Sequence, residues 1–256
     1  MRLFLSVLVI FIVASQLFAA RTLTGITGAV TQPYARTTKG FTVNAALNIG
    51  SARQMTPFFF TKEWDNLVFS EDDADTFSDI MDEKQESFLL GLSYGGSRFE
   101  GGVTVTKTEN LDGGGLHAKY RVFEVFDAQV ALGLDYTFLG YPLLWTLDSY
   151  MVVDYPVTEK LTASVNYATT NITAVYLKDT PYLINGHTLE THTLGLAASY
   201  EYDDKLDLAA DFMLGKKTGN VFGVEAEYSV TDNFSATAGL VTSSNVSVFT
   251  GIDWTF

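Results

Sequence analysis

The sequence contains no cysteine and few basic residues, and both shortages exclude classes of function. Without cysteine, no disulfide bond stabilises the fold and no thiolate is available as a nucleophile or metal ligand. The 16 Lys and Arg residues are outnumbered by 30 Asp and Glu residues, which gives a formal net charge of −14. Because nucleic acids are polyanions, a chain of this charge has no electrostatic basis for binding them.

Proline and long apolar runs are also scarce. Five prolines against 21 glycines suit long strands joined by short turns. The main apolar run, residues 3–13, is too short for a comfortable transmembrane helix. It follows Arg2 and is succeeded by the small residues Ala19 and Ala20. A basic start, a short apolar core and a small-residue end predict a secretory signal peptide over residues 1–20.

From residue 40 onward, apolar residues alternate with polar or small ones, as in strands that have two different faces. Near the start of this region, Phe41, Val43 and Ala45 alternate with Thr42 and Asn44. Twelve such segments can be counted as far as residue 256. Three further short stretches are able to form strands, so fourteen strands are the alternative: residues 26–31, 55–62 and 173–178.

Alternation alone does not decide which face lies inside. A soluble lipocalin-like barrel places the apolar set inward around a ligand, whereas a membrane barrel places it outward against lipid. The segments are roughly 9–11 residues long, the length that a tilted strand needs to cross the hydrocarbon layer. Twelve strands also enclose a lumen too wide for this apolar set to fill. The sequence therefore predicts an all-β fold, a transmembrane antiparallel up-and-down β-barrel with twelve strands.

The lengths of the connections indicate the topology. With the N-terminus on the periplasmic side, the even-numbered connections face the periplasm, and all of them are short. The two long connections, residues 51–87 and 169–191, are odd-numbered and therefore external, as in bacterial barrels. We expect residues 21–39 to form an N-terminal periplasmic segment and residues 40–256 to form the barrel.

The final strand carries alternating apolar residues and ends on an aromatic one, with Val248, Ile252, Trp254 and Phe256 in phase. This pattern resembles the C-terminal signal of bacterial outer-membrane β-barrels, the porin-like proteins. The resemblance implies a location in the bacterial outer membrane and contact with outer-membrane lipid. It also implies that the barrel-insertion machinery recognises Trp254 and Phe256.

The start of the mature chain has a weaker resemblance. It loosely resembles the opening of outer-membrane barrels associated with exopolysaccharide export. The match is short and depends mainly on glycine. The residues that carry it are Gly25-Ile26-Thr27-Gly28, Pro33-Tyr34-Ala35 and Gly40.

The face opposite the apolar set carries most of the charged residues of the predicted strands. A basic residue on the lipid-facing wall costs about 2–4 kcal/mol near the bilayer midplane, so this confinement favours a polar lumen. One strand carries His117, Lys119 and Arg121 between neighbours with Glu100 and Asp135, which predicts cross-strand ion pairs. The alternative to a selective pore is a salt-bridged filling that stiffens the barrel. The predicted lumen and selectivity residues are Glu100, His117, Lys119, Arg121, Asp135, Asp148, Asp207, Asp211, Glu225 and Glu227.

Acidic residues also gather in the first long connection. Clustered carboxylates suit hard cations, so binding of divalent cations at the acidic loop, residues 63–86, is one interpretation. The alternative is a solvated loop that keeps the rim of the barrel soluble. The acidic residues are Glu63, Asp65, Glu71, Asp72, Asp73, Asp75, Asp79, Asp82, Glu83 and Glu86.

Histidine gives little support for a metal site or an active site. His187, Glu190 and His192 are weak grounds for a metal site, because two imidazoles and a carboxylate at a loop junction commonly form a polar loop. Outer-membrane phospholipases pair a histidine with a serine on the outer wall. Here Ser164 and Ser199 share the lumen face while His192 does not, so no such pair is predicted. We expect no metal and no cofactor.

The sequence thus predicts an outer-membrane barrel that is not an enzyme. The favoured function is a small channel for ions or small polar solutes with a preference for cations. The alternative is a structural or surface-interaction barrel with a filled lumen and ligand-binding external loops. A lipid hydrolase is the least favoured alternative.

Overall fold

The computed structural model describes residues 28–29, 31–51, 84–108, 112–139, 144–174, 188–215, 220–242 and 246–256. Within these ranges, no helix is long and apolar enough to span a membrane. The described residues form twelve strands: β1 Gly40–Ser51, β2 Lys84–Gly95, β3 Phe99–Thr108, β4 Asp112–Val125, β5 Ala128–Leu139, β6 Leu144–Pro156, β7 Leu161–Ala174, β8 Thr188–Glu201, β9 Leu206–Gly215, β10 Asn220–Thr231, β11 Phe234–Thr242 and β12 Val246–Thr255.

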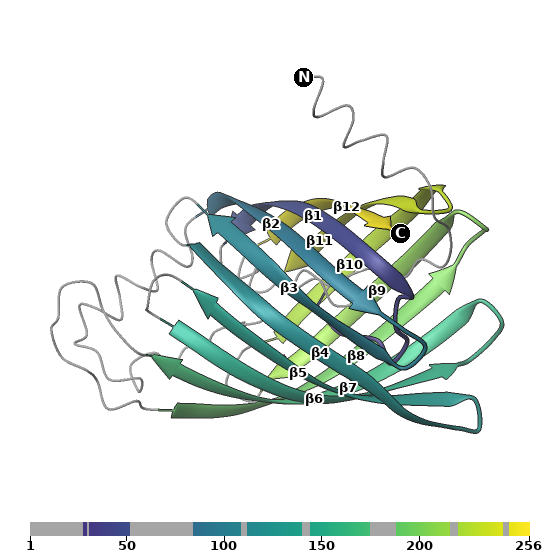
Figure 1. Ribbon diagram of the computed structural model, residues 1–256, viewed down its shortest axis with the longest axis horizontal. Helices are drawn as coiled ribbons and strands as arrows, with labels where there is room; N and C mark the ends of the chain where they lie inside the picture. The colour runs from purple at the N-terminus through teal and green to yellow at the C-terminus, as the bar shows by residue number, and fades with distance from the viewer. Residues whose placement is uncertain are drawn as a thin grey trace, which may run out of the picture.

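The sheet closes on itself. Each strand pairs antiparallel with its sequence neighbours, and β1 pairs with β12 to complete the barrel (Figure 1). At this seam the N–H of Phe256 donates to the carbonyl of Phe41 at 2.7 Å, and the N–H of Phe41 donates back at 3.3 Å. Closure removes the exposed sheet edges that would otherwise pair with other chains. The predicted twelve-stranded antiparallel barrel is confirmed.

The fourteen-strand alternative does not match this barrel. The first extra stretch contributes only an isolated bridge between Gly28 and Pro33 among the described residues. Residues 173–174 belong to the end of β7. The stretch 55–62 lies outside the described residues.

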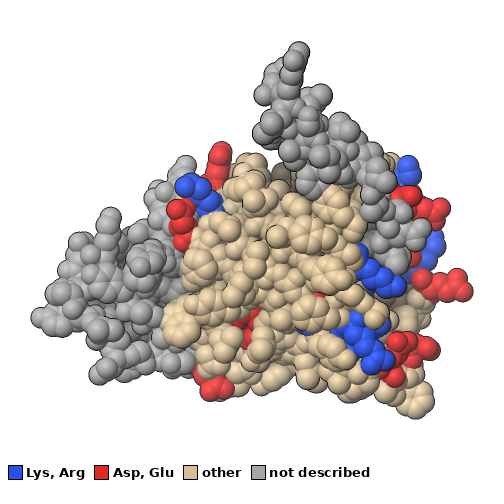
Figure 2. All heavy atoms as spheres, viewed as in Figure 1, with Lys and Arg blue, Asp and Glu red and all other residues tan. Residues whose placement is uncertain are grey.

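The outward face of the barrel is apolar. Along β2, Phe88, Leu90 and Leu92 are 40–47 % exposed, whereas the intervening Leu89 is buried. On the face shown in Figure 2, the Lys, Arg, Asp and Glu residues gather mainly toward the two ends and leave the middle largely uncharged. Water would penalise an apolar band of this extent, whereas the hydrocarbon of a bilayer solvates it. The predicted outward orientation of the apolar set is confirmed.

Five short turns join the strands at one end of the barrel, which we call the turn end. They are residues 96–98, 126–127, 157–160, 202–205 and 232–233. Phe126 and Asp127 both have positive φ, 50° and 66°, which suits a two-residue hairpin turn whose twist follows that of the strands. We call the opposite end the loop end. Residues 52–83 and 175–187, which make up most of the two long connections, lie outside the described residues.

Aromatic side chains form a belt near the turn end. The tyrosines among them are 41–59 % exposed, the position expected of rings at a membrane interface. Trp254 stacks on Phe256, with ring centroids 6.2 Å apart, and Phe256 lies 6.1 Å from the ring of Phe41 across the seam. The exposed tyrosines of this belt are Tyr94, Tyr155, Tyr200, Tyr202 and Tyr228.

Residues 31–38 lie inside the barrel, not in a separate periplasmic segment as expected for residues 21–39. The side chains of Gln32, Tyr34 and Ala35 are at most 2 % exposed. Hydrogen bonds join this stretch, the lumenal segment, to inward-facing side chains of β4, β6, β7 and β9. The physical reason is that carboxylates buried on the inner wall require donors, and the segment supplies its backbone N–H groups.

Candidate functional site

The inner wall carries a surplus of buried carboxylates. Eight acidic side chains of the described strands are at most 7 % exposed, and Lys119 is the one lysine buried with them in that part of the chain. The strands bring these acids together because each occupies an inward position of the alternating pattern. The eight are Glu100, Asp135, Asp148, Asp154, Asp211, Glu225, Glu227 and Asp253.

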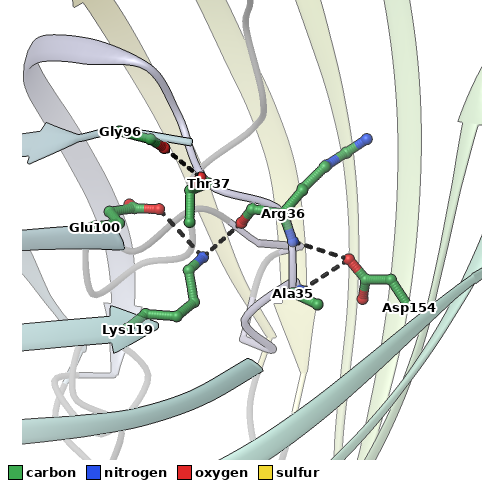
Figure 3. A network of polar contacts seen from close by, with 7 residues as sticks. All are labelled: Ala35, Arg36, Thr37, Gly96, Glu100, Lys119 and Asp154. Carbon is green, nitrogen blue, oxygen red and sulfur yellow. Dashed lines mark hydrogen bonds and ion pairs between the residues drawn. The ribbon is translucent and has the colours of Figure 1, made fainter. Parts of the chain in front are cut away.

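Glu100 and Lys119 form a buried ion pair. They are register partners on β3 and β4. The Lys119 Nζ lies 3.1 Å from Oε2 of Glu100, and both side chains are fully buried. The same Nζ donates a hydrogen bond of 2.8 Å to the carbonyl of Arg36 in the lumenal segment (Figure 3). The cross-strand pair that the sequence predicts is present, with a third partner that the sequence does not reveal.

Asp154 on β6 holds the centre of the lumenal segment. Its Oδ2 accepts the backbone N–H groups of Ala35 at 2.7 Å and of Arg36 at 3.2 Å (Figure 3). Its Oδ1 accepts the hydroxyl of Ser164 at 2.7 Å. Hydrogen bonds to an ionised carboxylate are roughly twice as strong as neutral ones, so Asp154 is a firm anchor.

Asp211 on β9 holds the start of the segment in the same way. Its Oδ2 accepts the backbone N–H of Thr31, the Thr31 hydroxyl at 2.9 Å and the N–H of Gln32 at 3.1 Å. The Gln32 side chain accepts a bond of 2.9 Å from Asn166 on β7. A β-carbon on Gly195 of β8 would lie 1.8 Å from Oε1 of Gln32, so the absent side chain makes room for the segment.

Arg36 brings a positive charge into this acidic surrounding. Its guanidinium carbon lies 4.5 Å from the centroid of the Tyr34 ring, within cation–π range. In Figure 3 the side chain points away from Lys119 and Glu100. It interacts electrostatically with carboxylates of three strands: Asp154 of β6, Asp207 of β9, and Glu225 and Glu227 of β10.

The predicted lumen residues separate into two groups. Arg121 lies near the turn end, where it donates to the carbonyl of Ser97 at 2.6 Å and to Oε1 of Gln129 at 3.1 Å. Asp207 is partly exposed near the same end. Eight predicted residues are buried on the inner wall: Glu100, His117, Lys119, Asp135, Asp148, Asp211, Glu225 and Glu227. Their part in selectivity stays a prediction.

Two features of the lumen were not assigned from the sequence. Asp154 anchors the lumenal segment although it was not selected as a site residue; its inward position in the alternation was the available signal. The second is an apolar cluster on the inner wall near the loop end. Buried polar residues such as Asn48, Ser87 and Ser247 lie at the same end, so the inner wall there is mixed and not purely apolar. The cluster is Leu89, Met213, Val221, Val241 and Phe249.

His192 lies on the outward face of β8. Its Nδ1 contacts the hydroxyl of Tyr167 at 3.0 Å and of Thr169 at 3.4 Å, and its Nε2 lies 3.7 Å from Oε1 of Glu190. Within the described residues, no group of three or more His, Asp or Glu side chains is placed to hold a metal ion. His187 and acidic residues 63–83 lie outside the described ranges.

Comparisons with known proteins bear on the fold. No family model matches the chain. No curated protein matches it either. Among solved structures, the KdgM porin has a TM-score of 0.60 at 11 % identity, covering 84 % of this chain and 99 % of the porin chain. The chain shares the fold of outer-membrane porins.

Two further structures agree. The NanC porin has a TM-score of 0.58 at 9 % identity, covering 84 % of this chain and 100 % of its own. The COG4313 outer membrane channel from Pseudomonas putida F1 has a TM-score of 0.53 at 12 % identity, covering 87 % and 98 %. The porin-like fold and the apolar outward face both agree with the predicted outer-membrane location.

Proposed function

We propose that this protein is an outer-membrane channel that passes ions or small polar solutes and prefers cations. The observation that carries the proposal is the inner wall, where eight carboxylates are buried with a single lysine among the described strands. A closed barrel with an apolar exterior separates this polar interior from lipid. Fixed negative charge along a narrow passage raises the local concentration of cations and lowers that of anions.

The charge of the lumen also bears on the class of solute. The similar KdgM porin has been solved in complex with oligogalacturonate, which is a polyanion. An acid-rich wall repels polyanions, because each carboxylate adds an unfavourable Coulomb term that is weakly screened away from bulk water. Small cations and neutral polar solutes therefore fit this lumen better than acidic oligosaccharides.

The test is the reversal potential of the purified full-length protein in planar bilayers under a potassium chloride gradient. The wild type is expected to show single-channel steps and a reversal potential on the cation-selective side. Glu225→Gln with Glu227→Gln removes two buried charges from β10 with little change of shape. It is expected to move the reversal potential toward zero.

The matched control removes two charges outside the lumen. Glu159→Gln with Asp204→Asn alters exposed acids in two turns at the turn end, and it is expected to leave the reversal potential nearly unchanged. An anion-selective wild type, or equal shifts from both double variants, contradicts the proposal.

A structural barrel with a filled lumen is the second candidate, and one observation favours it. The lumenal segment places Tyr34 and Ala35 inside the barrel with at most 1 % of each exposed. A permanently filled lumen conducts no ions. Absence of single-channel steps from protein shown to be folded would favour this candidate over the channel.

A further inference from the structure

The lumenal segment crosses the barrel. The carbonyl of Arg36 accepts from Lys119 on β4, while its guanidinium interacts electrostatically with Glu225 and Glu227 on β10. In the closed ring of twelve strands, β4 and β10 are six positions apart in either direction. Arg36 therefore lies between opposite walls, with a hydrogen bond to one and electrostatic attraction to acids of the other.

A small number of hydrogen bonds hold the lumenal segment on either side of Arg36. Asp154 and Asp211 each accept two consecutive backbone N–H groups of the segment. The Thr37 hydroxyl donates to the carbonyl of Gly96 at 2.7 Å, close to the turn end. These anchors are strong but few, and water can replace each of them when the segment leaves.

Apolar packing of the segment depends on one large side chain. Tyr34 and Ala29 pack with Ala197 and Ala209, and Ala35 belongs to a cluster around Tyr150. Besides Tyr34, this part of the chain contributes only the small side chains of Ala29 and Ala35 to the two clusters. Tyr34 is among the largest fully buried side chains, so one aromatic side chain and the polar anchors together hold the segment in place.

From this geometry we propose that residues 31–38 are an internal plug, and that their release from Asp154 and Asp211 opens the channel. The inference rests on the channel function proposed above. Arg36 acts as a tethered cation that occupies the acidic part of the lumen, so a permeating cation competes with it for the same carboxylates. Departure of the plug both widens the passage and uncovers its negative charge.

A reversible covalent lock tests the plug. The Gln32 Cγ lies 3.1 Å from the position of a β-carbon on Gly195, and a disulfide requires β-carbons about 3.5–4.5 Å apart. Gln32→Cys with Gly195→Cys places one cysteine on the segment and one on β8. The natural chain has no cysteine, so this disulfide is the only one that can form within the chain.

The oxidised double variant is expected to conduct less than the same preparation after dithiothreitol, with bond formation verified by mass spectrometry. Each single cysteine variant, carried through the same oxidation and reduction, is expected to show no change. Equal conductance of the oxidised and reduced forms overturns the plug and leaves the channel proposal intact. Failure of the disulfide to form in folded protein overturns the placement of the plug.

A second variant keeps the test independent of the cysteines. Asp154→Asn with Asp211→Asn weakens both anchors and is expected to raise the open population roughly tenfold or more, as loss of a charge-assisted hydrogen bond implies. An unchanged open population overturns the plug. Wild-type protein that is silent in bilayers overturns the channel function, and the opening step with it.

Discussion

The buried ion pair between Glu100 and Lys119 gives the sharpest stability prediction. Lys119→Met keeps the length of the side chain but removes its charge, and it leaves the Glu100 carboxylate buried without the ammonium that lies 3.1 Å from it. Breaking one side of a buried pair typically costs about 3–5 kcal/mol. Loss of the 2.8 Å hydrogen bond to the carbonyl of Arg36 adds roughly 0.5–1.5 kcal/mol. We therefore expect the free energy of unfolding to fall by about 3.5–6.5 kcal/mol.

The assay is urea-dependent folding into lipid vesicles, followed by tryptophan fluorescence. Lys107 and Asp112 supply a matched control, because they are also register partners on β3 and β4. Their charged atoms are 3.7 Å apart and both side chains are 72 % exposed. Lys107→Met is expected to cost at most about 1 kcal/mol, as is typical of surface pairs.

A double variant distinguishes two costs of Lys119→Met: the loss of the attraction between the two side chains, and the burial of the Glu100 charge without Lys119. Lys119→Met with Glu100→Gln removes both charges, so we expect it to recover part of the stability that Lys119→Met loses. A Lys119→Met variant no less stable than Lys107→Met, or a double variant less stable than Lys119→Met alone, would contradict this prediction.

Two further predictions concern packing in the lumen and the final strand. Gly133→Val places a β-carbon 2.0 Å from Cζ of Tyr150 and should lower the free energy of unfolding by about 1–3 kcal/mol, as overpacked cores do. In the control Gly96→Ala, the added β-carbon meets nothing within 4 Å. The urea concentration at which half of this variant is unfolded should equal that of the wild type. Phe256→Ala removes the predicted insertion signal and ring contacts at the seam, so less heat-modifiable barrel should appear in the outer-membrane fraction. Phe126→Ala, on an exposed turn, should not reduce that amount, and equal yields would contradict the assigned signal.

The barrel could be predicted from the sequence because period-two alternation places every second side chain on one face. Phe88, Leu90 and Leu92 face outward as a consequence of that spacing alone. The pairing of Glu100 with Lys119 could also be anticipated, because adjacent antiparallel strands joined by a short turn bring such residues into register. Both the barrel and this ion pair therefore follow from the local alternation and from the short connections between strands.

The lumenal segment could not be predicted in this way. Its anchors are backbone N–H groups, which every residue other than proline carries and which leave no mark on the sequence. The match between Gln32 and Gly195 joins positions far apart in the chain, and it becomes visible only when the closed barrel brings them together. Residues 31–38 also lack strand alternation, so a separate periplasmic segment was the simpler interpretation.

The turn at Gly40 has a consequence for how the molecule is put together. With φ of 95°, this residue redirects the chain from the interior into the wall, and a β-carbon there would meet the carbonyl oxygen of Phe256 at 2.4 Å. The cylinder is completed where β1 meets β12, the last of the twelve strands to be synthesised. The lumenal segment directly precedes β1 in the chain, so the wall that β1 and β12 close surrounds the residues next to its own first strand. Glycine at this junction lets the chain pass from the interior into the wall while the end of β12 stays close to it.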